Sequence, residues 1–140
     1  MRADDNKSQI FTERRQMELI RKNQIKVLAN PGVESAQLLN PENSTSEKVT
    51  ITKVRVEPGE VQKKHAHEAA EQIWVALKGS GILLLENDQT IDFFEGDVVR
   101  FPENTIHGLQ NDFDSVFEYL SVTSPPLNFR RAYRVEKQSQ

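Results

Sequence analysis

Turn-forming residues interrupt the sequence at intervals of about ten residues, and this punctuation limits the fold more than any other feature. Between the turns lie short runs that are β-branched or that alternate between apolar and polar residues. Many short strands at this spacing are typical of an all-β sandwich or barrel. A parallel α/β fold is excluded because the sequence has no helices to form its crossovers. We predict strands over residues 35–39, 49–56, 72–78, 82–85, 90–94, 98–101, 106–109 and 116–123.

The segment before these strands has a less regular pattern. Met17 and Leu19 alternate with polar residues as in a short strand, and Asn23 would then cap a brief helix over residues 24–29. A single helix over residues 12–29 fits the same stretch. The expected fold is therefore all-β with a short helical or strand segment at its amino-terminal side.

The length of 140 residues suits one domain with a sizeable core. No internal repeat is visible, which excludes a protein of two barrels. We expect a flexible tail over residues 1–15, where the sequence is polar and charge-mixed, a single domain over residues 16–133 and a carboxyl-terminal tail over residues 134–140.

Charge and cysteine content exclude several classes of function. The net charge is −3 and the pI is about 5.7, so we expect neither nucleic acid nor a membrane surface as a partner. The chain has no cysteine, which rules out disulfides, zinc–thiolate sites and thiol catalysis. The amino terminus lacks the apolar core of a secretion signal, and no run approaches the roughly 20 apolar residues of a membrane span. We expect a cytoplasmic protein.

The three histidines of the chain are the main candidates for chemistry. His65 and His67 are two residues apart, and in an extended strand such residues project from the same face of the sheet. Their imidazole nitrogens would therefore point towards one position. The third histidine, His107, follows a turn, a predicted strand and a second turn that begin at Gly96.

The residues around the histidines form two motifs at fixed offsets. Five residues separate Gly59 from the His-x-His pair, four more precede Gln72, and six more precede Gly79. In the second motif, counted from Gly96, the matching positions are Pro102, Asn104, His107 and Asn111. This arrangement resembles the two paired motifs of the cupin family, with the short separation of its small single-domain members. The resemblance covers roughly residues 49–123 and implies a double-stranded β-helix, or jelly-roll barrel.

In cupins the histidines of the two motifs converge on a divalent metal inside the barrel. By position, the resemblance implies His65, His67 and His107 as ligands, together with the residue in the family's glutamate position. The two spacings allowed for that position select either Glu71 or Gln72.

Strand alternation bears on this choice. Adjacent strand residues point to opposite faces, and the apolar residues at 73, 75 and 77 share the face of Glu71. This phase favours Gln72 as the inward-facing ligand, although a bulge in the two alanines before Glu71 would reverse it. Three imidazoles and a carboxamide are neutral, so the site would keep the full double charge of the metal. With Glu71 the site would have the commoner mixed set of three imidazoles and one carboxylate, which suits the oxygen chemistry of iron or manganese. The expected cofactor is one divalent transition metal: iron, manganese, nickel or zinc.

Four further residues are candidates for the substrate pocket. Trp74 shares the predicted face of Gln72, and Lys63 is in phase with the histidine pair and would reach the mouth of the barrel as an anion clamp. Arg100 and Tyr119 are polar groups in predicted strands that suit a substrate contact or a proton transfer. The catalytic residues themselves are not identifiable from the sequence.

The family resemblance implies several functions, because cupins include dioxygenases, isomerases, lyases, sugar-binding modules and storage proteins. We expect a metal-dependent enzyme, an isomerase/lyase or a dioxygenase, that acts on a small oxygenated or carboxylate-bearing molecule by Lewis-acid coordination. The alternative is a non-catalytic module that binds or senses a sugar or carboxylate. Some cupins with glutamine as a ligand act on unsaturated uronic sugars, but the charged pair that follows their last strand is absent from residues 125–129 here.

Overall fold

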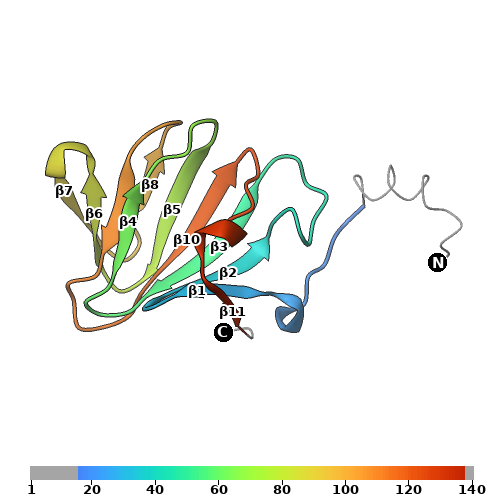
Figure 1. The fold of residues 1–140 in the computed structure, drawn as a ribbon, viewed down its shortest axis with the longest axis horizontal. Coiled ribbons are helices and arrows are strands. Elements are labelled where there is room, and N and C mark those ends of the chain that lie inside the picture. Colours follow the sequence, from blue (N-terminus) through green and yellow to red (C-terminus); the bar gives the residue numbers. More distant parts are fainter. Residues whose placement is uncertain (1–15, 138–140) are drawn as a thin grey trace, which may run out of the picture.

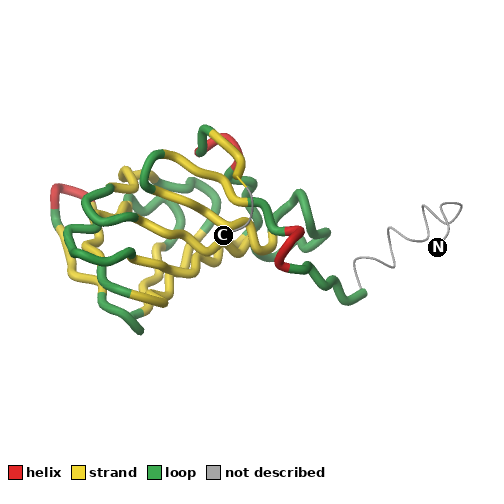
Figure 2. The backbone as a smooth tube through the Cα atoms, turned by 90° about the horizontal axis from the view of Figure 1, so that it is seen from below, coloured by secondary structure: helices red, strands yellow, loops and turns green. Residues whose placement is uncertain are grey.

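The computed structural model describes residues 16–137, which form two packed antiparallel sheets. Figures 1 and 2 show that strands and loops make up nearly all of this part, with only short helical turns. The larger sheet has the order β11-β1-β2-β3-β10-β5-β8, and the smaller one has the order β4-β9-β6-β7. The predicted all-β jelly roll is therefore confirmed. The strands are β1 (Val27–Asn30), β2 (Val33–Leu39), β3 (Thr50–Val56), β4 (Val61–His65), β5 (Glu71–Lys78), β6 (Gly81–Leu85), β7 (Thr90–Phe93), β8 (Val98–Phe101), β9 (His107–Gln110), β10 (Phe117–Ser124) and β11 (Val135–Lys137).

The predicted helices near the amino terminus are wrong. Residues 24–29 form the end of a 3-10 turn, η2 (Lys22–Gln24), followed by β1, and residues 17–21 contain no strand. Local helix propensity yields here to tertiary packing, because β1 lies between β2 and β11 and its first three residues are all buried. The expected flexible tail, residues 1–15, lies outside the described residues.

The carboxyl-terminal part returns to the larger sheet. β11 pairs antiparallel with β1 in a register that aligns Val27 with Lys137, so the sheet extends past residue 133, where the sequence predicted the domain to end. We call the residues from Pro125 to Lys137 the C-terminal strap. They follow β10, include the turn η4 (Arg130–Ala132) and end with β11. Figure 1 shows this strap in red beside β3 and β10.

Two close backbone approaches bring the histidine-bearing segments together. A Cβ atom on Gly108 would lie 2.8 Å from the Gln62 carbonyl oxygen, so glycine allows β9 to lie tightly against β4. Asn104 has a φ of 60°, the left-handed conformation that asparagine tolerates, and its N–H donates to the His67 carbonyl oxygen at 2.7 Å. These contacts fix the two motif loops relative to each other.

Part of the outer face of the larger sheet, along β5 and β8, carries a stripe of apolar side chains. On β5, Ile73, Val75 and Leu77 face outwards, and β8 adds Val98, which pairs with Val75 and is 64% exposed. No helix within residues 16–137 is long and apolar enough to cross a bilayer.

We predict that this outer face is the contact surface of a homodimer, because an exposed apolar stripe on a flat sheet is stabilised by burial against a second copy. Light scattering at micromolar concentration should give twice the mass of the chain. Val98→Lys should shift the protein towards monomer, whereas Ile91→Lys, at another exposed apolar position, should not. A monomeric unmodified chain would contradict the prediction.

Candidate metal centre

The three histidines converge from two strands and a loop at one end of the smaller sheet. His65 is the last residue of β4, His107 is the first residue of β9, and the two are paired in the strand register. His67 lies in the loop that follows β4. Their candidate ligand nitrogens all lie within 4.8 Å of one another. Three imidazoles at this separation indicate a site for one metal ion.

Backbone carbonyl groups orient two of the rings. The Nδ1 atom of His65 lies 2.8 Å from the Lys63 carbonyl oxygen, and that of His107 lies 2.8 Å from the Thr105 carbonyl oxygen. A carbonyl oxygen only accepts, so each Nδ1 carries the proton in the neutral ring. The Nε2 atoms are left with free lone pairs, which is the state that binds a metal.

Gln72 adds an oxygen to this cluster. It is buried at the start of β5, its side-chain amide donates to the Thr123 hydroxyl at 2.9 Å, and its Oε1 accepts from the indole N–H of Trp74 at 3.1 Å. An indole can only donate, so the contact with Trp74 identifies the oxygen end of the carboxamide. That oxygen lies 3.0 Å from Nε2 of His107.

Two features of this arrangement fit a bound cation. Neutral His107 has a single N–H but faces an acceptor at each ring nitrogen, so Nε2 and Oε1 of Gln72 meet as two lone pairs. The Nε2 atom of His67 is buried and has no hydrogen-bond partner. Buried polar atoms without partners are rare in folded proteins. A metal ion would bind all of these lone pairs at once.

The rings of His67 and His107 are neutral near pH 7. Burial, reinforced by the positive charge that His65 can carry, lowers the pKa of His67 to about 4. The same causes lower the pKa of His107 to about 4. Neutral imidazole is the metal-binding form, so the metal would not compete with protons near pH 7.

Glu71 lies away from the cluster. Its carboxylate accepts from Nε of Arg100 at 2.8 Å on the outer face of the larger sheet. Arg100, a pocket candidate from the sequence, is therefore placed outside, in an ion pair, and is not among the residues that line the cavity.

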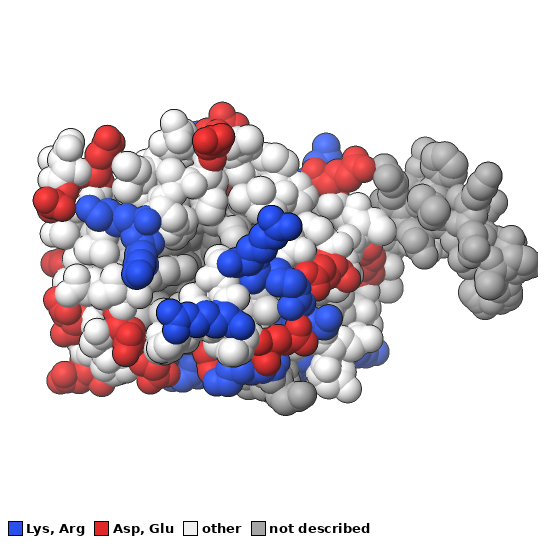
Figure 3. All heavy atoms as spheres, viewed as in Figure 1, with Lys and Arg blue, Asp and Glu red and all other residues white. Residues whose placement is uncertain are grey.

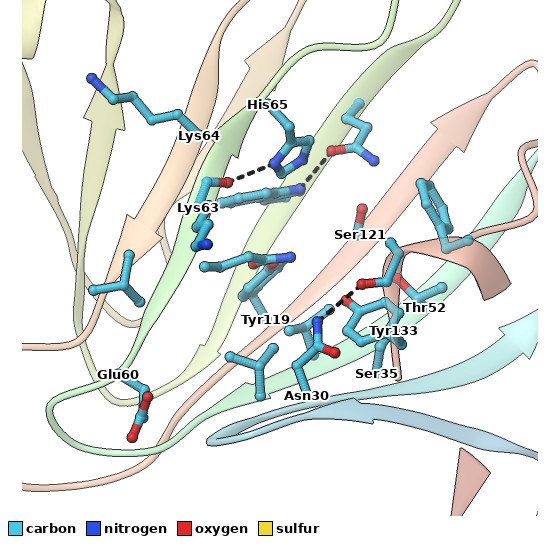
Figure 4. A pocket seen from close by; sticks show the side chains of 18 of the residues that line it. Asn30, Ser35, Thr52, Glu60, Lys63, Lys64, His65, Tyr119, Ser121 and Tyr133 are labelled. Atoms are coloured by element: carbon cyan, nitrogen blue, oxygen red, sulfur yellow. Dashed lines mark hydrogen bonds between the residues drawn. The ribbon is translucent and has the colours of Figure 1, made fainter. Parts of the chain in front are cut away.

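A cavity of about 680 Å³ opens onto the cluster. His65, His67 and Gln72 line it, together with three of the candidates from the sequence, Trp74, Tyr119 and Lys63. Figure 4 shows His65 and Lys63 on β4 facing Tyr119 across this space. The Tyr119 hydroxyl donates to Oε1 of Gln62, and burial raises the pKa of Tyr119, so the phenol keeps its proton.

The opposite wall comes from the C-terminal strap, whose role the sequence did not reveal. Phe129, Arg131, Tyr133 and Arg134 line the cavity, and the ring of Phe129 lies 5.7 Å from that of His67. The sequence analysis ended the domain at residue 133, assigned residues 134–140 to a tail and gave neither part a role in the pocket. No local sequence pattern could have predicted this wall, because the position of the strap depends on the pairing of β11 with β1.

Comparisons with known proteins agree with this fold. A family model described as a cupin domain matches residues 52–123. Uncharacterized protein MJ1618 of Methanocaldococcus jannaschii is 27% identical over 90 residues, which are 64% of this chain and 71% of that protein. The structure of KdgF from Halomonas sp. has a TM-score of 0.66 at 20% identity, covering 79% of this chain and 96% of that one. The structure of the polyketide cyclase RemF from Streptomyces resistomycificus has a TM-score of 0.68 at 18% identity, covering 88% of this chain and 85% of that one.

We expect the stability of the metal-free protein to fall as the pH decreases from about 6.5 to 4.5. In this range the unfolded chain takes up protons on His67 and His107, because an unperturbed histidine has a pKa of 6.5, whereas the folded chain, with pKa values of about 4, does not. Thermal denaturation after chelator treatment measures the effect. The carboxylate of Glu42, whose pKa the Arg130 guanidinium lowers to about 2, contributes only below 4.5.

The matched variant is His107→Gln, which removes one of the two titrating rings. Its melting temperature should change less between pH 6.5 and 4.5 than that of the unmodified chain. Equal slopes for the two proteins would show that burial of His107 does not control this pH dependence.

Proposed function

The chain belongs to the cupin family, and from its site we propose that it is a metal-dependent enzyme acting on a small oxygenated or carboxylate-bearing molecule. The observation that carries the proposal is the position of the cluster. Three of its members, His65, His67 and Gln72, line the 680 Å³ cavity, so the open side of the site faces a space that suits a small molecule. The proposed reaction classes are isomerisation or elimination, and dioxygenation.

The proposed ligands are Nε2 of His65, His67 and His107 and Oε1 of Gln72. All four groups are neutral, so a divalent ion of iron, manganese, nickel or zinc would retain its full charge in the site. Such an ion supplies Lewis acidity, which polarises an oxygen-containing group of the substrate. The chain itself orients the ligands through the carbonyl groups of Lys63 and Thr105.

The residues of the cavity support binding of an oxygen-rich molecule next to the ligands. Trp74 and Phe129 provide aromatic walls, and Tyr119 presents a protonated phenol. The part of the barrel behind the site is closed, because the ring of Phe101 stacks on His107 at 4.1 Å and excludes water from that side.

One observation favours the alternative of a non-catalytic binding or sensor module. Among the described residues that line the cavity, the only carboxylate is that of Glu60. It precedes β4, about 16 Å along the strand from His65 at the usual rise per residue. Figure 4 shows it at the far end of the cavity. The cavity therefore offers no carboxylate beside the ligands that could act as a catalytic base. A module that only binds its ligand would need no such base.

We predict that protein purified without an affinity metal, or incubated with iron, manganese, nickel or zinc, holds about one metal ion per chain. Elemental analysis after desalting measures this. Gln72→Ala and His107→Ala should each lower the metal content severalfold, because ligands and their orienting contacts typically change affinity by 10- to 100-fold. Glu71→Ala is the control and should retain the metal. Loss in Glu71→Ala with retention in Gln72→Ala would reverse the ligand assignment.

We predict turnover of small acids or sugars by the metal-loaded protein. A panel of 2-hydroxy acids, 2-oxo acids and unsaturated uronates can be followed by proton NMR together with an oxygen electrode. Isomerase or lyase activity gives product without oxygen uptake, and dioxygenase activity consumes one O₂ per product. His107→Ala should lower the rate at least 100-fold. Saturable, metal-dependent binding across the panel without product would instead support the binding module.

A further inference from the structure

We propose that the C-terminal strap makes the far wall of the cavity an anion-binding site, so that the ligand carries a second acidic group remote from the atoms that meet the histidines. This inference rests on the proposed function, since it concerns the other end of the same ligand. It assigns a role to residues that lie after the part of the chain matched by the family model, 52–123.

The strap is held rigidly at several points along its length. The Thr50 hydroxyl donates to the Leu127 carbonyl oxygen at 2.8 Å near its start. Two nitrogens of Arg130 donate to the two carboxylate oxygens of Glu42 at 2.7 and 2.8 Å, and a third lies 3.0 Å from Glu136. Paired contacts of this kind fix a guanidinium and its backbone in one orientation.

The next residues are held by the side chain of Asn30, the last residue of β1. The side-chain amide of Asn30 donates to the Ala132 carbonyl oxygen at 2.9 Å, and its Oδ1 accepts from the N–H of Arg134 at 2.9 Å. The segment that carries Arg131 is therefore anchored on both sides. A cation presented from a rigid segment loses less entropy on binding an anion than one on a flexible tail.

The charges that line the cavity are mainly positive. Lys63, Arg131 and Arg134 line it, and none of the three makes an ion pair within residues 16–137. Glu60 is the only acidic residue among the described residues that line it. This excess is unusual for a chain with a net charge of −3. Arg100 and Arg130, by contrast, have acidic partners outside the cavity.

Basic side chains lie around the opening of the cavity. Figure 3 shows Lys and Arg side chains on both sides of a hollow in this face of the molecule. Both Lys63 and Lys64 on β4 line the cavity, but their partners differ. The Lys64 side chain, which Figure 4 shows pointing away from His65 and Tyr119, forms an ion pair with Asp88, whereas Lys63 forms none within residues 16–137. Of the two, Lys63 therefore has the charge that is left for an anion.

The remaining polar groups of the cavity add no opposing charge. Burial raises the pKa of Tyr133, as it does for Tyr119, so both phenols stay protonated. Next to the histidines, Phe129 of the strap and Trp74 offer apolar surface for a carbon chain. The lining thus combines lone pairs for a metal, apolar walls beside them and, further along the strap, the guanidinium groups of Arg131 and Arg134. A dicarboxylate, or a carboxylate joined to a phosphate, has matching chemistry.

Isothermal titration of the metal-loaded full-length protein tests the inference with three probes. Glutarate carries an acid group at each end, valerate has the same number of carbons with one acid group, and 3-phosphoglycerate joins a carboxylate to a phosphate. Glutarate or 3-phosphoglycerate should bind at least tenfold more tightly than valerate, and the tighter of the two identifies the second group as carboxylate or phosphate.

The preference for a doubly acidic probe should fall about tenfold in Arg131→Gln, because a charge-assisted hydrogen bond is lost. Lys78→Gln, which removes an exposed charge that does not line the cavity, should keep the full preference. Equal affinities for valerate and both other probes, or an unchanged preference in Arg131→Gln and in Arg134→Gln, would overturn the inference.

The experiment separates this inference from the proposed function. If valerate binds only to metal-loaded protein and its affinity equals those of the doubly acidic probes, the metal site stands and the anion site is wrong. If the protein takes up no metal, or if all three probes bind equally well before and after chelation, the proposed function fails and the inference with it.

Discussion

The hydrogen bond from the indole N–H of Trp74 to Gln72 determines the chemistry of the site. Because the indole can only donate, it fixes the carboxamide with its oxygen towards His107. That oxygen then faces an imidazole nitrogen whose own proton is held on the opposite side of the ring. Two lone pairs 3.0 Å apart in a buried position are unfavourable unless a cation lies between them. The side-chain network is therefore arranged for a bound metal ion.

The neutrality of the proposed ligand set links the site to the rest of the cavity. No carboxylate among the proposed ligands offsets the charge of a divalent ion, and Arg131 and Arg134 on the strap add to it. Glu71, which would have reduced the charge, pairs instead with Arg100 on the outer face. The space between the histidines and the strap is thus suited to anions, in a protein whose overall charge is negative.

Much of the fold could be predicted from local patterns, because each of the eight predicted strands is amphipathic or β-branched over its own length. Alternation along β5 also placed Gln72 on the inward face with Trp74. What could not be predicted depends on contacts between distant residues. The local sequence of β1 predicts part of a helix, but the segment forms a strand because it pairs with β2 and β11. In that pairing Val27 aligns with Lys137, which lies near the other end of the chain. The cationic wall of the cavity depends on that same pairing.

The most direct test of the metal centre is the position of the ion itself. Crystals of the protein loaded with zinc should show a single anomalous peak about 2.0–2.1 Å from Nε2 of all three histidines, the usual length of zinc–imidazole bonds. The account predicts that Oε1 of Gln72 completes the ligand set from the protein. A peak elsewhere, or a peak bonded to the carboxylate of Glu71 with Gln72 turned away, would contradict it.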